Sequence, residues 1–510
     1  MYSAHRVHKI SIAFFLANFA VIHSALATTP LFQTPYQTLP FPICDADLVV
    51  TPEMAPIPVI NKGADGEPRP YVYLPPQVPL DVEGYPTAPA GLELEQVHVY
   101  VRHGERTPVG IRLANAPANI PPHWKMCKTA RRFQAAVAEM TDMPGTQKGW
   151  NGVHQVRRVV ERQDGSAVDG ECLLGELTDV GRQSTYNYGI ALRQLYVNRL
   201  GFIPDVLENT RSVYFRSTNM PRTLESLQQI MHGLYPNEKC LEHAYPPLLV
   251  RNGKDENLIG NTYSCKRLGI LQLGFAKAAA DAYNPMLELL DKRISKYIDG
   301  NPVRVDGKPR ASGIMDTIRA SLAHGIKVPP EFEDQSVVDT LEHAIVQEWF
   351  ADKTDEVRRL AMGRLLEDLT NKMQRKIDKG DKDPLKILVH STHDTALAGL
   401  CSTLDVYDEK WPAFTASVTF ELFKSRMRPE VQQQGQSQGI LAKLGGGTPP
   451  VEYYVRMRYQ NQTMPLPLCA EEGKHLNGAP EFCTFKAFRE RMKELIPDDW
   501  DAECSSNTRS

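Results

Sequence analysis

The chain has 510 residues, of which 42% are hydrophobic and 23% are charged, and its formal net charge is −3 at pH 7. This length can bury a large core and predicts either one large domain with an insertion or two domains. The ordinary composition argues against a disordered chain, and the lack of a basic excess argues against a nucleic-acid partner.

The N-terminus has the features of a secretory signal peptide. Arg6 and Lys9 precede an apolar run over residues 10–22, and an Ala-Leu-Ala cleavage pattern follows at residues 25–27. We therefore predict a signal peptide over residues 1–27 and a secreted or secretory-pathway location, which includes the cell wall and the vacuole. An uncleaved membrane anchor is the alternative. Because no second long apolar run occurs, we expect no stable membrane span after cleavage.

The stretch that follows is rich in proline and contains the first cysteine of the chain, Cys44. Residues 28–90 favour extended chain and predict an arm without a core of its own, which a disulfide from Cys44 would tie down. Nine cysteines in a secreted chain predict several disulfides and one thiol left over. We predict that Cys469 pairs with Cys483 across a short loop, and that Cys401 is the odd thiol.

The first strong pattern is a buried strand that ends in a basic loop. The stretch over residues 94–101, Leu-Glu-Gln-Val-His-Val-Tyr-Val, is apolar and β-branched enough to predict a buried strand, and the polar stretch 102–108 begins abruptly after it. His103 is therefore expected at the carboxyl end of a strand, flanked by Arg102 and Arg106. In an open α/β sheet, ligands bind at those carboxyl ends.

The residue types of this loop suit a phosphoryl group. Two guanidiniums that cannot lose their charge flank an imidazole that can attack phosphorus. Such an attack splits one difficult displacement into two easier ones through a phosphohistidine. The alternative interpretation is a solvated basic loop with no chemistry of its own.

A second strand-and-helix unit follows in the chain. Helical spacing begins at Thr178, a predicted N-cap, and stops at Gly201. A short strand is then expected over residues 211–215, ended by Arg216, with a helix starting at residues 217–218. A strand, an arginine and a helix N-terminus in succession are typical of a phosphate site.

The middle of the chain is predicted to be mainly helical. We assign residues 241–380 to a helical cap domain inserted into the α/β domain, with its apolar stripes read as packed helix faces. A buried strand at residues 386–390 then leads to His393 and Asp394, and a helix follows from Thr395. A polar pair thus falls at the end of a strand for the second time.

The last part of the chain alternates like a pair of strands. Residues 415–423 and 451–459 show this alternation, and the segment between them, rich in glutamine and glycine, is expected to be a surface loop. The sequon at Asn461 predicts a glycoprotein. A final helix is predicted to end at Pro497.

These motifs resemble those of a known family. The stretch Arg102–Pro108 reads Arg-His-Gly-Glu-Arg-Thr-Pro and is similar to the Arg-His-Gly-x-Arg-x-Pro signature of the histidine acid phosphatases, within the phosphoglycerate-mutase-like superfamily. Residues 213–218 resemble the second arginine motif of that family, and His393-Asp394 resembles its distal dipeptide. Residues 175–178 and 410–412 resemble the lysophosphatidic acid phosphatase-like branch in particular.

The resemblance implies an architecture. It runs from about residue 94 to the C-terminus and implies an α/β fold, namely a three-layer domain with a central, mostly parallel sheet and an inserted, mainly helical cap. Because the cap over residues 241–380 is inserted into it, the catalytic domain is expected to be discontinuous, over residues 91–240 and 381–504.

The resemblance also implies roles for single residues. His103 is the expected nucleophile, and Asp394 is the expected general acid for the leaving alcohol. Four side chains are expected to bind the phosphate oxygens: Arg102, Arg106, Arg216 and His393. The scheme uses no metal and no cofactor, because the arginines supply the positive charge that magnesium supplies in kinases.

The predicted function is a secreted, metal-independent acid phosphatase that hydrolyses small-molecule phosphate monoesters through a phosphohistidine. Two alternatives keep the fold and change the substrate to an inositol polyphosphate or to lysophosphatidate. A phosphotransferring mutase is disfavoured by the signal peptide and by the distal His-Asp pair. A secreted protein that binds a phosphorylated partner without turnover is the remaining alternative, although binding alone needs neither a nucleophile nor an acid.

Overall fold

The computed structural model describes residues 79–129, 132–135, 154–426 and 451–505. The predicted signal peptide and most of the predicted proline-rich arm, including Cys44, lie outside the described residues, as does most of the predicted surface loop before residue 451. All described residues belong to one compact unit.

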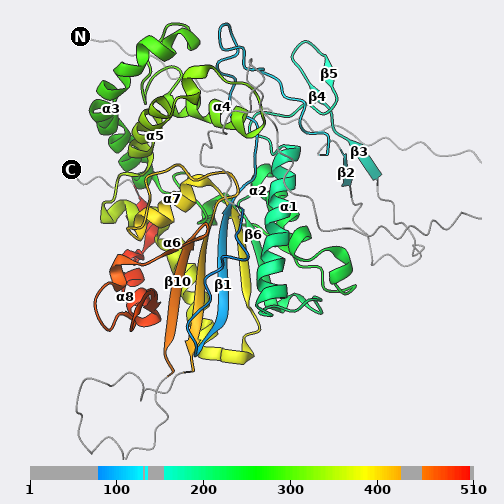
Figure 1. Ribbon diagram of the computed structural model, residues 1–510, viewed down its shortest axis with the longest axis vertical. Coiled ribbons are helices and arrows are strands. Elements are labelled where there is room, and N and C mark those ends of the chain that lie inside the picture. The colour runs from blue at the N-terminus through cyan, green and yellow to red at the C-terminus, as the bar shows by residue number, and fades with distance from the viewer. Residues whose placement is uncertain (1–78, 130–131, 136–153, 427–450, 506–510) are drawn as a thin grey trace, which may run out of the picture. The chain divides into compact units, whose positions relative to one another are not determined.

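A nine-stranded mixed sheet forms the centre of the fold, with β1 near its middle (Figure 1). The strand order is β12-β13-β10-β9-β1-β8-β6-β7, and β11 pairs with β10. The strands of this sheet are β1 (Leu92–Arg102), β6 (Val213–Ser217), β7 (Leu248–Leu249), β8 (Ile387–Thr392), β9 (Ser417–Ser425), β10 (Tyr453–Tyr459), β11 (Gln462–Met464), β12 (His475–Leu476) and β13 (Ala479–Thr484). Two small hairpins lie outside it: β2 (Arg132–Ala135) with β3 (His154–Arg157), and β4 (Val160–Glu161) with β5 (Ala167–Val168).

The α/β class is confirmed, but the prediction of a mostly parallel sheet is wrong. Three pairings are parallel, those of β1 with β8, β8 with β6, and β6 with β7. The other five pairings, on the β9 side of β1, are antiparallel. Two of these antiparallel pairs, β10 with β11 and β12 with β13, are joined by turns of two residues, which parallel strands cannot accept.

Helices cover both faces of the sheet. The helices are α1 (Asp179–Arg193), α2 (Pro221–Leu234), α3 (Lys266–Ile294), α4 (Ala311–Ala323), α5 (Gln335–Phe350), α6 (Asp355–Lys379), α7 (Asp394–Thr403), α8 (Phe485–Leu495) and α9 (Trp500–Cys504). Val97, Val99 and Val101 of β1 pack with the apolar residues of α1 and α2. Tyr100 points to the opposite face and packs with α6, α7 and α8. The alternation is the period of two expected of a strand.

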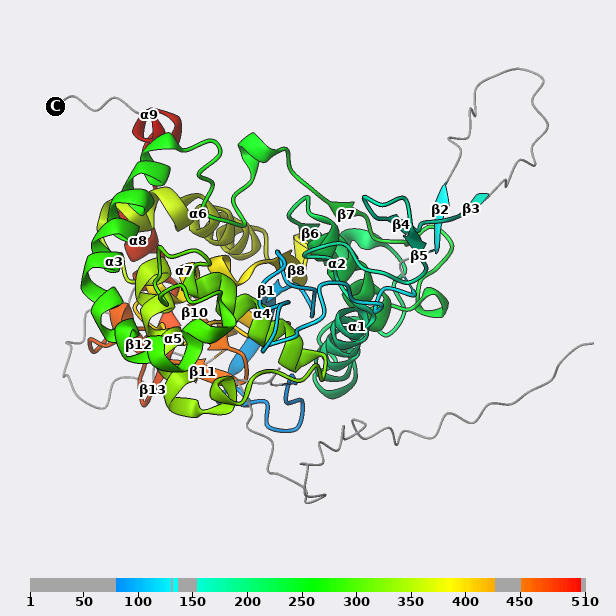
Figure 2. The same cartoon turned by 90° about the horizontal axis from the view of Figure 1, so that it is seen from above.

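The range predicted as the cap contains two kinds of helix. α3, α4 and α5 share a core of their own, which is separate from the two sheet cores. In contrast, Leu366, Leu369 and Met373 of α6 lie in the core beneath the sheet. Figure 2 shows α3 and α5 on one side of the molecule and α1 and α2 on the other, with β1 and α4 between them. α6 therefore belongs to the sheet layers by its packing.

The local predictions agree closely with the observed elements. The hydroxyl of Thr178 accepts a hydrogen bond from Gly181 N at 3.2 Å and caps α1, as expected. Gly201 has φ +56°, a left-handed conformation that favours glycine and ends this helical stretch, whose last part is a π-helix over Gln194–Arg199. Two differences matter for the site: β6 extends to Ser217 and therefore includes Arg216, and α2 begins at Pro221, later than the predicted start at residues 217–218.

The cysteines follow the sequence prediction in part. Cys469 pairs with Cys483, as predicted, and two further pairs join Cys127 to Cys172 and Cys265 to Cys504. Cys401 is buried and free, as predicted, but Cys240 is also free among the described cysteines. Within the described ranges, no helix is long and apolar enough to cross a membrane.

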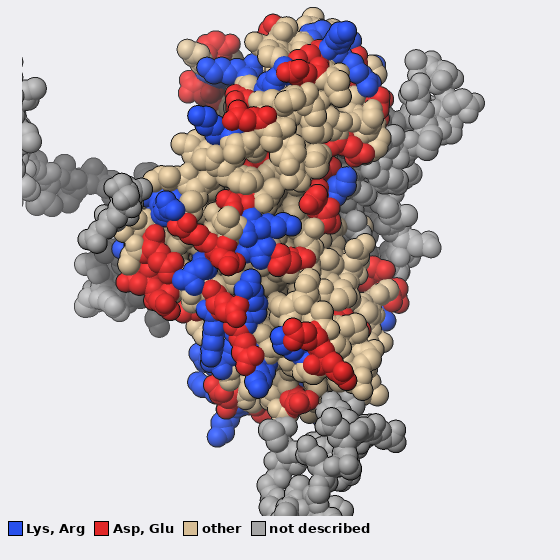
Figure 3. Space-filling view, turned by 90° about the vertical axis from the view of Figure 1, so that its left-hand side faces the viewer, with Lys and Arg blue, Asp and Glu red and all other residues tan. Residues whose placement is uncertain are grey.

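Charges of both signs are distributed over the face shown in Figure 3. Lysine and arginine side chains alternate with aspartate and glutamate over the lower half of this face, and a broad uncharged band crosses its upper half.

The sequon residue Asn461 lies in the turn between β10 and β11, where its amide oxygen accepts from Asp81 N at 2.9 Å and its amide nitrogen donates to Pro79 O at 2.8 Å.

Candidate active site

Two parallel strands end side by side and bring the two histidines together. Arg102, the last residue of β1, lies opposite Thr392, the last residue of β8. One residue further on, His103 N donates to Thr392 O at 3.0 Å. The rings of His103 and His393 consequently lie edge to face, with centroids 5.5 Å apart. The two segments that were predicted to converge do so.

A close approach of two backbones fixes the loop that carries His103. A Cβ atom at Gly104 would lie 2.4 Å from Gly181 O, and one at Gly181 would lie 2.1 Å from Glu105 O. Both positions therefore require glycine. The amide of Gly104 also donates to the hydroxyl of Ser226 in α2 at 3.1 Å. The loop is thus held against α1 and α2.

The hydrogen bonding of His103 identifies its reactive nitrogen. Nδ1 lies 2.9 Å from Gly104 O, and because a carbonyl only accepts, Nδ1 carries the proton. Nε2 therefore keeps a lone pair. Burial lowers the pKa of His103 well below its ordinary value, and Arg102 and Arg106 lower it further. Both effects favour the neutral ring, which is the nucleophilic form.

Arg102 joins the motif loop to the distal dipeptide. Its Nη2 lies 2.6 Å from Oδ2 of Asp394, and its Nη1 donates to Pro412 O at 2.6 Å. Burial lowers the pKa of Arg102 to about 10, so the group stays charged throughout the acidic range. Its guanidinium carbon lies 4.2 Å from the centre of the Phe414 ring.

Asp394 begins α7 and is an ionised carboxylate. Burial alone would raise its pKa, but Arg102, Arg106 and His393 outweigh burial and lower it. Oδ1 accepts from Thr395 N at 2.8 Å, and Oδ2 accepts from the indole Nε1 of Trp411 at 3.0 Å. Its place in the first turn of a helix also favours the charged form.

Arg106 is held by a carboxylate from the cap helices. Its Nη1 donates to Asp316 Oδ1 in α4 at 2.8 Å, and Val109 N donates to Asp316 Oδ2 at 2.9 Å. Asp316 thereby joins α4 to the motif loop. No sequence motif marks Asp316, because its role depends on a contact between residues 210 positions apart.

The structure does not bring Arg216 to this cluster, and the prediction that it binds phosphate there is corrected. Because β6 continues to Ser217, the alternation of the strand turns Arg216 away from α2, toward the α6 face. There it forms a buried ion pair with Glu256, and Nη1 donates to Asn257 Oδ1 at 2.7 Å. Only 1% of its side chain is exposed.

Arg222, which the sequence analysis missed, takes that place. It lies in the first turn of α2, and its guanidinium makes no ion pair or hydrogen bond with any other described residue. Burial lowers its pKa, and the neighbouring Arg106 lowers it further. A cation in the first turn of a helix opposes the helix dipole. This unfavourable position is the sequence feature that could have identified Arg222 as a binding residue.

His393 is oriented by the segment between β6 and α2. Its Nε2 lies 3.0 Å from the hydroxyl of Thr218, which in turn lies 2.8 Å from the hydroxyl of Thr223. Burial lowers the pKa of His393 to about 3, with Arg222 as the next cause. The pocket therefore combines two neutral imidazoles, one carboxylate and three guanidiniums.

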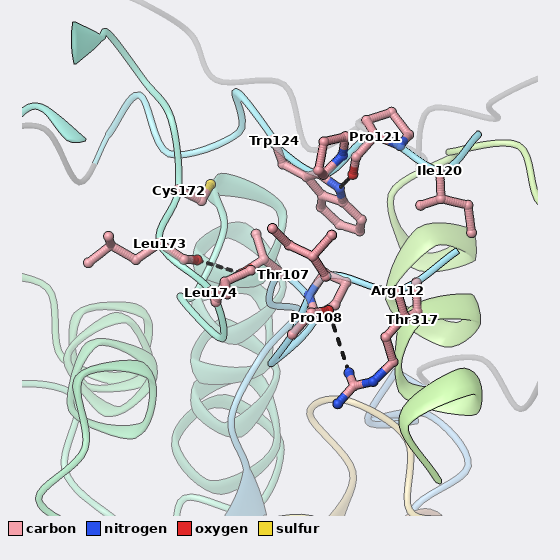
Figure 4. A pocket seen from close by; sticks show the side chains of 13 residues that line it. Thr107, Pro108, Arg112, Ile120, Pro121, Trp124, Cys172, Leu173, Leu174 and Thr317 are labelled. Carbon is pink, nitrogen blue, oxygen red and sulfur yellow. Dashed lines mark hydrogen bonds between the residues drawn. The ribbon is translucent and has the colours of Figure 1, made fainter. Parts of the chain in front are cut away.

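An apolar rim borders this cluster and is formed by Val109, Ile111, Leu173 and Leu174, each about half exposed. Two chain segments meet here, because Thr107 Oγ1 donates to Leu173 O at 2.7 Å (Figure 4). A Cβ at Gly175 would lie 3.4 Å from Val109 Cγ1 and 3.9 Å from Arg222 Nη1, which places the rim next to the guanidinium.

The sequence is similar to those of known phosphatases. The family model for the histidine phosphatase superfamily (branch 2) matches residues 93–460. A probable acid phosphatase of Schizosaccharomyces pombe is 33% identical over 449 residues, which cover 82% of this chain and 95% of that protein. Lysophosphatidic acid phosphatase type 6 of Mus musculus is 26% identical and covers 66% of this chain and 77% of its own length. Among solved structures, the Hafnia alvei phytase covers 82% of this chain and all of its own, at 14% identity and a TM-score of 0.49.

The family match and the S. pombe relative each span well over half of the chain, including both halves of the cluster. The chain belongs to branch 2 of the histidine phosphatase superfamily and is a phosphoric monoester hydrolase.

Proposed function

We propose that this chain hydrolyses phosphate monoesters through a phosphohistidine formed on Nε2 of His103. One observation carries the proposal, namely that a neutral imidazole with a free Nε2 lies against His393, among Arg102, Arg106 and Arg222. Guanidiniums neutralise the phosphoryl oxygens and position the phosphorus, which is most of what catalysis of phosphoryl transfer requires.

In the first step, Nε2 of His103 attacks phosphorus and the bond from phosphorus to the ester oxygen breaks. Asp394 gives its proton to the departing alkoxide. The free carboxyl is ionised, but a bound phosphoryl group brings negative charge beside it and raises its pKa. In acid the substrate is largely a monoanion, and this anion supplies the proton that Asp394 passes on.

In the second step, Asp394 is a carboxylate again and accepts a proton from a water molecule. That water attacks phosphorus on the side opposite His103, the bond from Nε2 to phosphorus breaks, and inorganic phosphate leaves. The three guanidiniums bind the same oxygens in both steps, since they lie around a fixed phosphorus position.

The proposal predicts activity without a metal. Purified protein is expected to hydrolyse p-nitrophenyl phosphate at acidic pH at the same rate with and without EDTA, because Arg102, Arg106 and Arg222 supply the positive charge. The measurement is initial rate across an EDTA titration, with a magnesium-dependent phosphatase as the control. Loss of activity in EDTA, restored by a divalent cation, would contradict the scheme.

The apolar rim favours an apolar leaving group over an inositol polyphosphate. In the two segments that form it, residues 107–112 and 172–176, the charged side chains are Arg112 and Glu176. Arg112 lies 3.9 Å from Asp316, and Glu176 pairs with Arg158. A polyanion would meet no unpaired cation on this rim, whereas an alkyl or acyl chain would cover exposed leucine side chains.

A chain-length series tests this preference. In the wild type, kcat/KM is expected to rise from methyl to hexyl phosphate, and Leu173→Ser with Leu174→Ser is expected to lower the hexyl-to-methyl ratio about tenfold, since each half-covered leucine contributes about 0.7 kcal/mol. Leu289→Ser is the matched control, because Leu289 is an exposed leucine on α3. A ratio that the double variant leaves unchanged would remove the rim from substrate binding.

We also propose that the protein enters the secretory pathway and leaves the cytosol. The N-terminal pattern over residues 1–27 supports this, and so do the three cysteine pairs, which are typical of an oxidising compartment.

A further inference from the structure

A chain of contacts runs from the cap helices to the carboxyl group of Asp394. Arg319 of α4 donates to Glu342 Oε1 of α5 at 2.5 Å, and Trp411 N donates to the same oxygen at 2.7 Å. The indole Nε1 of Trp411 then donates to Asp394 Oδ2 at 3.0 Å. Trp411 is therefore attached to the cap through its backbone and to the active site through its ring.

The indole ring itself is held by aromatic contacts. Its centre lies 5.1 Å from that of Phe350 and 5.7 Å from that of Trp349, both in α5. The adjacent Pro412 O accepts from Arg102 Nη1 at 2.6 Å, so the segment that carries Trp411 also fixes the arginine that shares Oδ2 of Asp394. The single N–H donor of the indole is thus directed at Asp394, with the ring packed against α5.

We propose that Trp411 is the positioning residue of the general acid: its indole N–H aims the carboxyl of Asp394 at the leaving oxygen and limits how readily that carboxyl takes up a proton. The proposal rests on the proposed role of Asp394. Two donors, Arg102 and Trp411, meet on Oδ2, while Thr395 N binds Oδ1. A neutral donor on a carboxylate stabilises the charged form and fixes its plane.

The other groups around Asp394 do not replace Trp411. The charged and titratable side chains that face it are Arg102 from β1, Arg106 and His103 from the motif loop, Arg222 from α2 and the adjacent His393, with Asp316 and Arg319 of α4 beyond Arg106 and Arg102. The three arginines nearest the carboxyl and the two imidazoles also serve the phosphate. Trp411 contacts the carboxyl and has no place among the phosphate donors, so its effect should be confined to proton transfer.

Trp411→Phe tests this, because phenylalanine keeps the packing on α5 and removes the donor. The ratio of kcat/KM for p-nitrophenyl phosphate to that for methyl phosphate is expected to rise about tenfold, since methoxide needs a proton to leave and p-nitrophenolate does not. The basic limb of kcat for methyl phosphate is expected to move up by roughly one pH unit, as loss of a donor raises the pKa of the carboxyl. Trp349→Phe, which removes an indole that contacts Trp411, is the control and should change neither quantity.

A double-variant cycle separates positioning from general destabilisation. In an Asp394→Asn background, Trp411→Phe is expected to change kcat/KM for methyl phosphate less than twofold, because the group it acts through is gone. Equal losses in both backgrounds, with no change in the leaving-group ratio, would overturn the proposal. If Asp394→Asn itself left that ratio unchanged, the proposed acid would fail first. If only Trp411→Phe left it unchanged, the positioning role alone would fail.

Discussion

Replacing His103 by alanine is expected to lower kcat for p-nitrophenyl phosphate by at least about 10³-fold, because the covalent route is lost with Nε2. The fold should persist. The loop is held by backbone bonds, from His103 N to Thr392 O and from Gly104 N to Ser226, which the substitution keeps. The measurements are steady-state turnover and the thermal unfolding midpoint.

The same variant tests the intermediate directly. Wild-type protein mixed with labelled substrate and quenched in alkaline denaturant, where phosphohistidine is stable, should retain label, and His103→Ala should retain none. His232→Ala is the matched control, because His232 is exposed on α2 and should behave as the wild type. A His103→Ala protein that still incorporated label would show that another group receives the phosphoryl.

The strands that carry the site could be predicted because local signals and topology agree. Residues 97–101 read Val-His-Val-Tyr-Val and are rich in β-branched and aromatic side chains, as befits a strand, and a polar loop follows at once. The same succession occurs before His393. Since parallel strands end at one edge of a sheet, the convergence of His103 and His393 could be predicted from the sequence. Their rings indeed lie 5.5 Å apart.

The rest of the site depends on contacts that the sequence does not encode locally. Asp316 reaches Arg106, and Trp411 reaches Asp394, only once the cap helices are folded over the sheet. The sheet was misjudged for a related reason. The alternation of residues 415–423 and 451–459 predicted a pair of strands, but their antiparallel place beside β1 is set by tertiary packing.

Arg216 shows how the point at which a strand ends decides the role of a side chain. The prediction ended the strand at Arg216 and placed its side chain in the loop, whereas two more residues of β6 turn the guanidinium to the α6 face. There it meets Glu256, whose Oε1 also accepts from Asn257 N at 2.9 Å and Leu258 N at 2.8 Å. This arginine holds a connecting loop, and it does not contact the motif loop.

Arg222→Ala is therefore expected to lower kcat/KM for phosphate monoesters by about 10² to 10³-fold, the usual effect of losing one donor to a developing charge. Its free energy of unfolding should stay within about 1 kcal/mol of the wild type, because Arg222 has no ion-pair partner among the described residues and faces like charge from Arg106. Activity is measured with p-nitrophenyl phosphate, and stability by urea unfolding.

Arg216→Ala should show the opposite pattern. Removing it leaves the carboxylate of Glu256, 6% exposed, without its cation, which costs about 3–5 kcal/mol of stability. The protein that remains folded at low temperature should keep kcat/KM within a few-fold of the wild type. The two arginines lie six residues apart, but Arg216 is bound by Glu256 on the α6 face, whereas Arg222 lies beside His103 and His393. An Arg216→Ala protein that kept its stability and lost its activity would return Arg216 to the phosphate site.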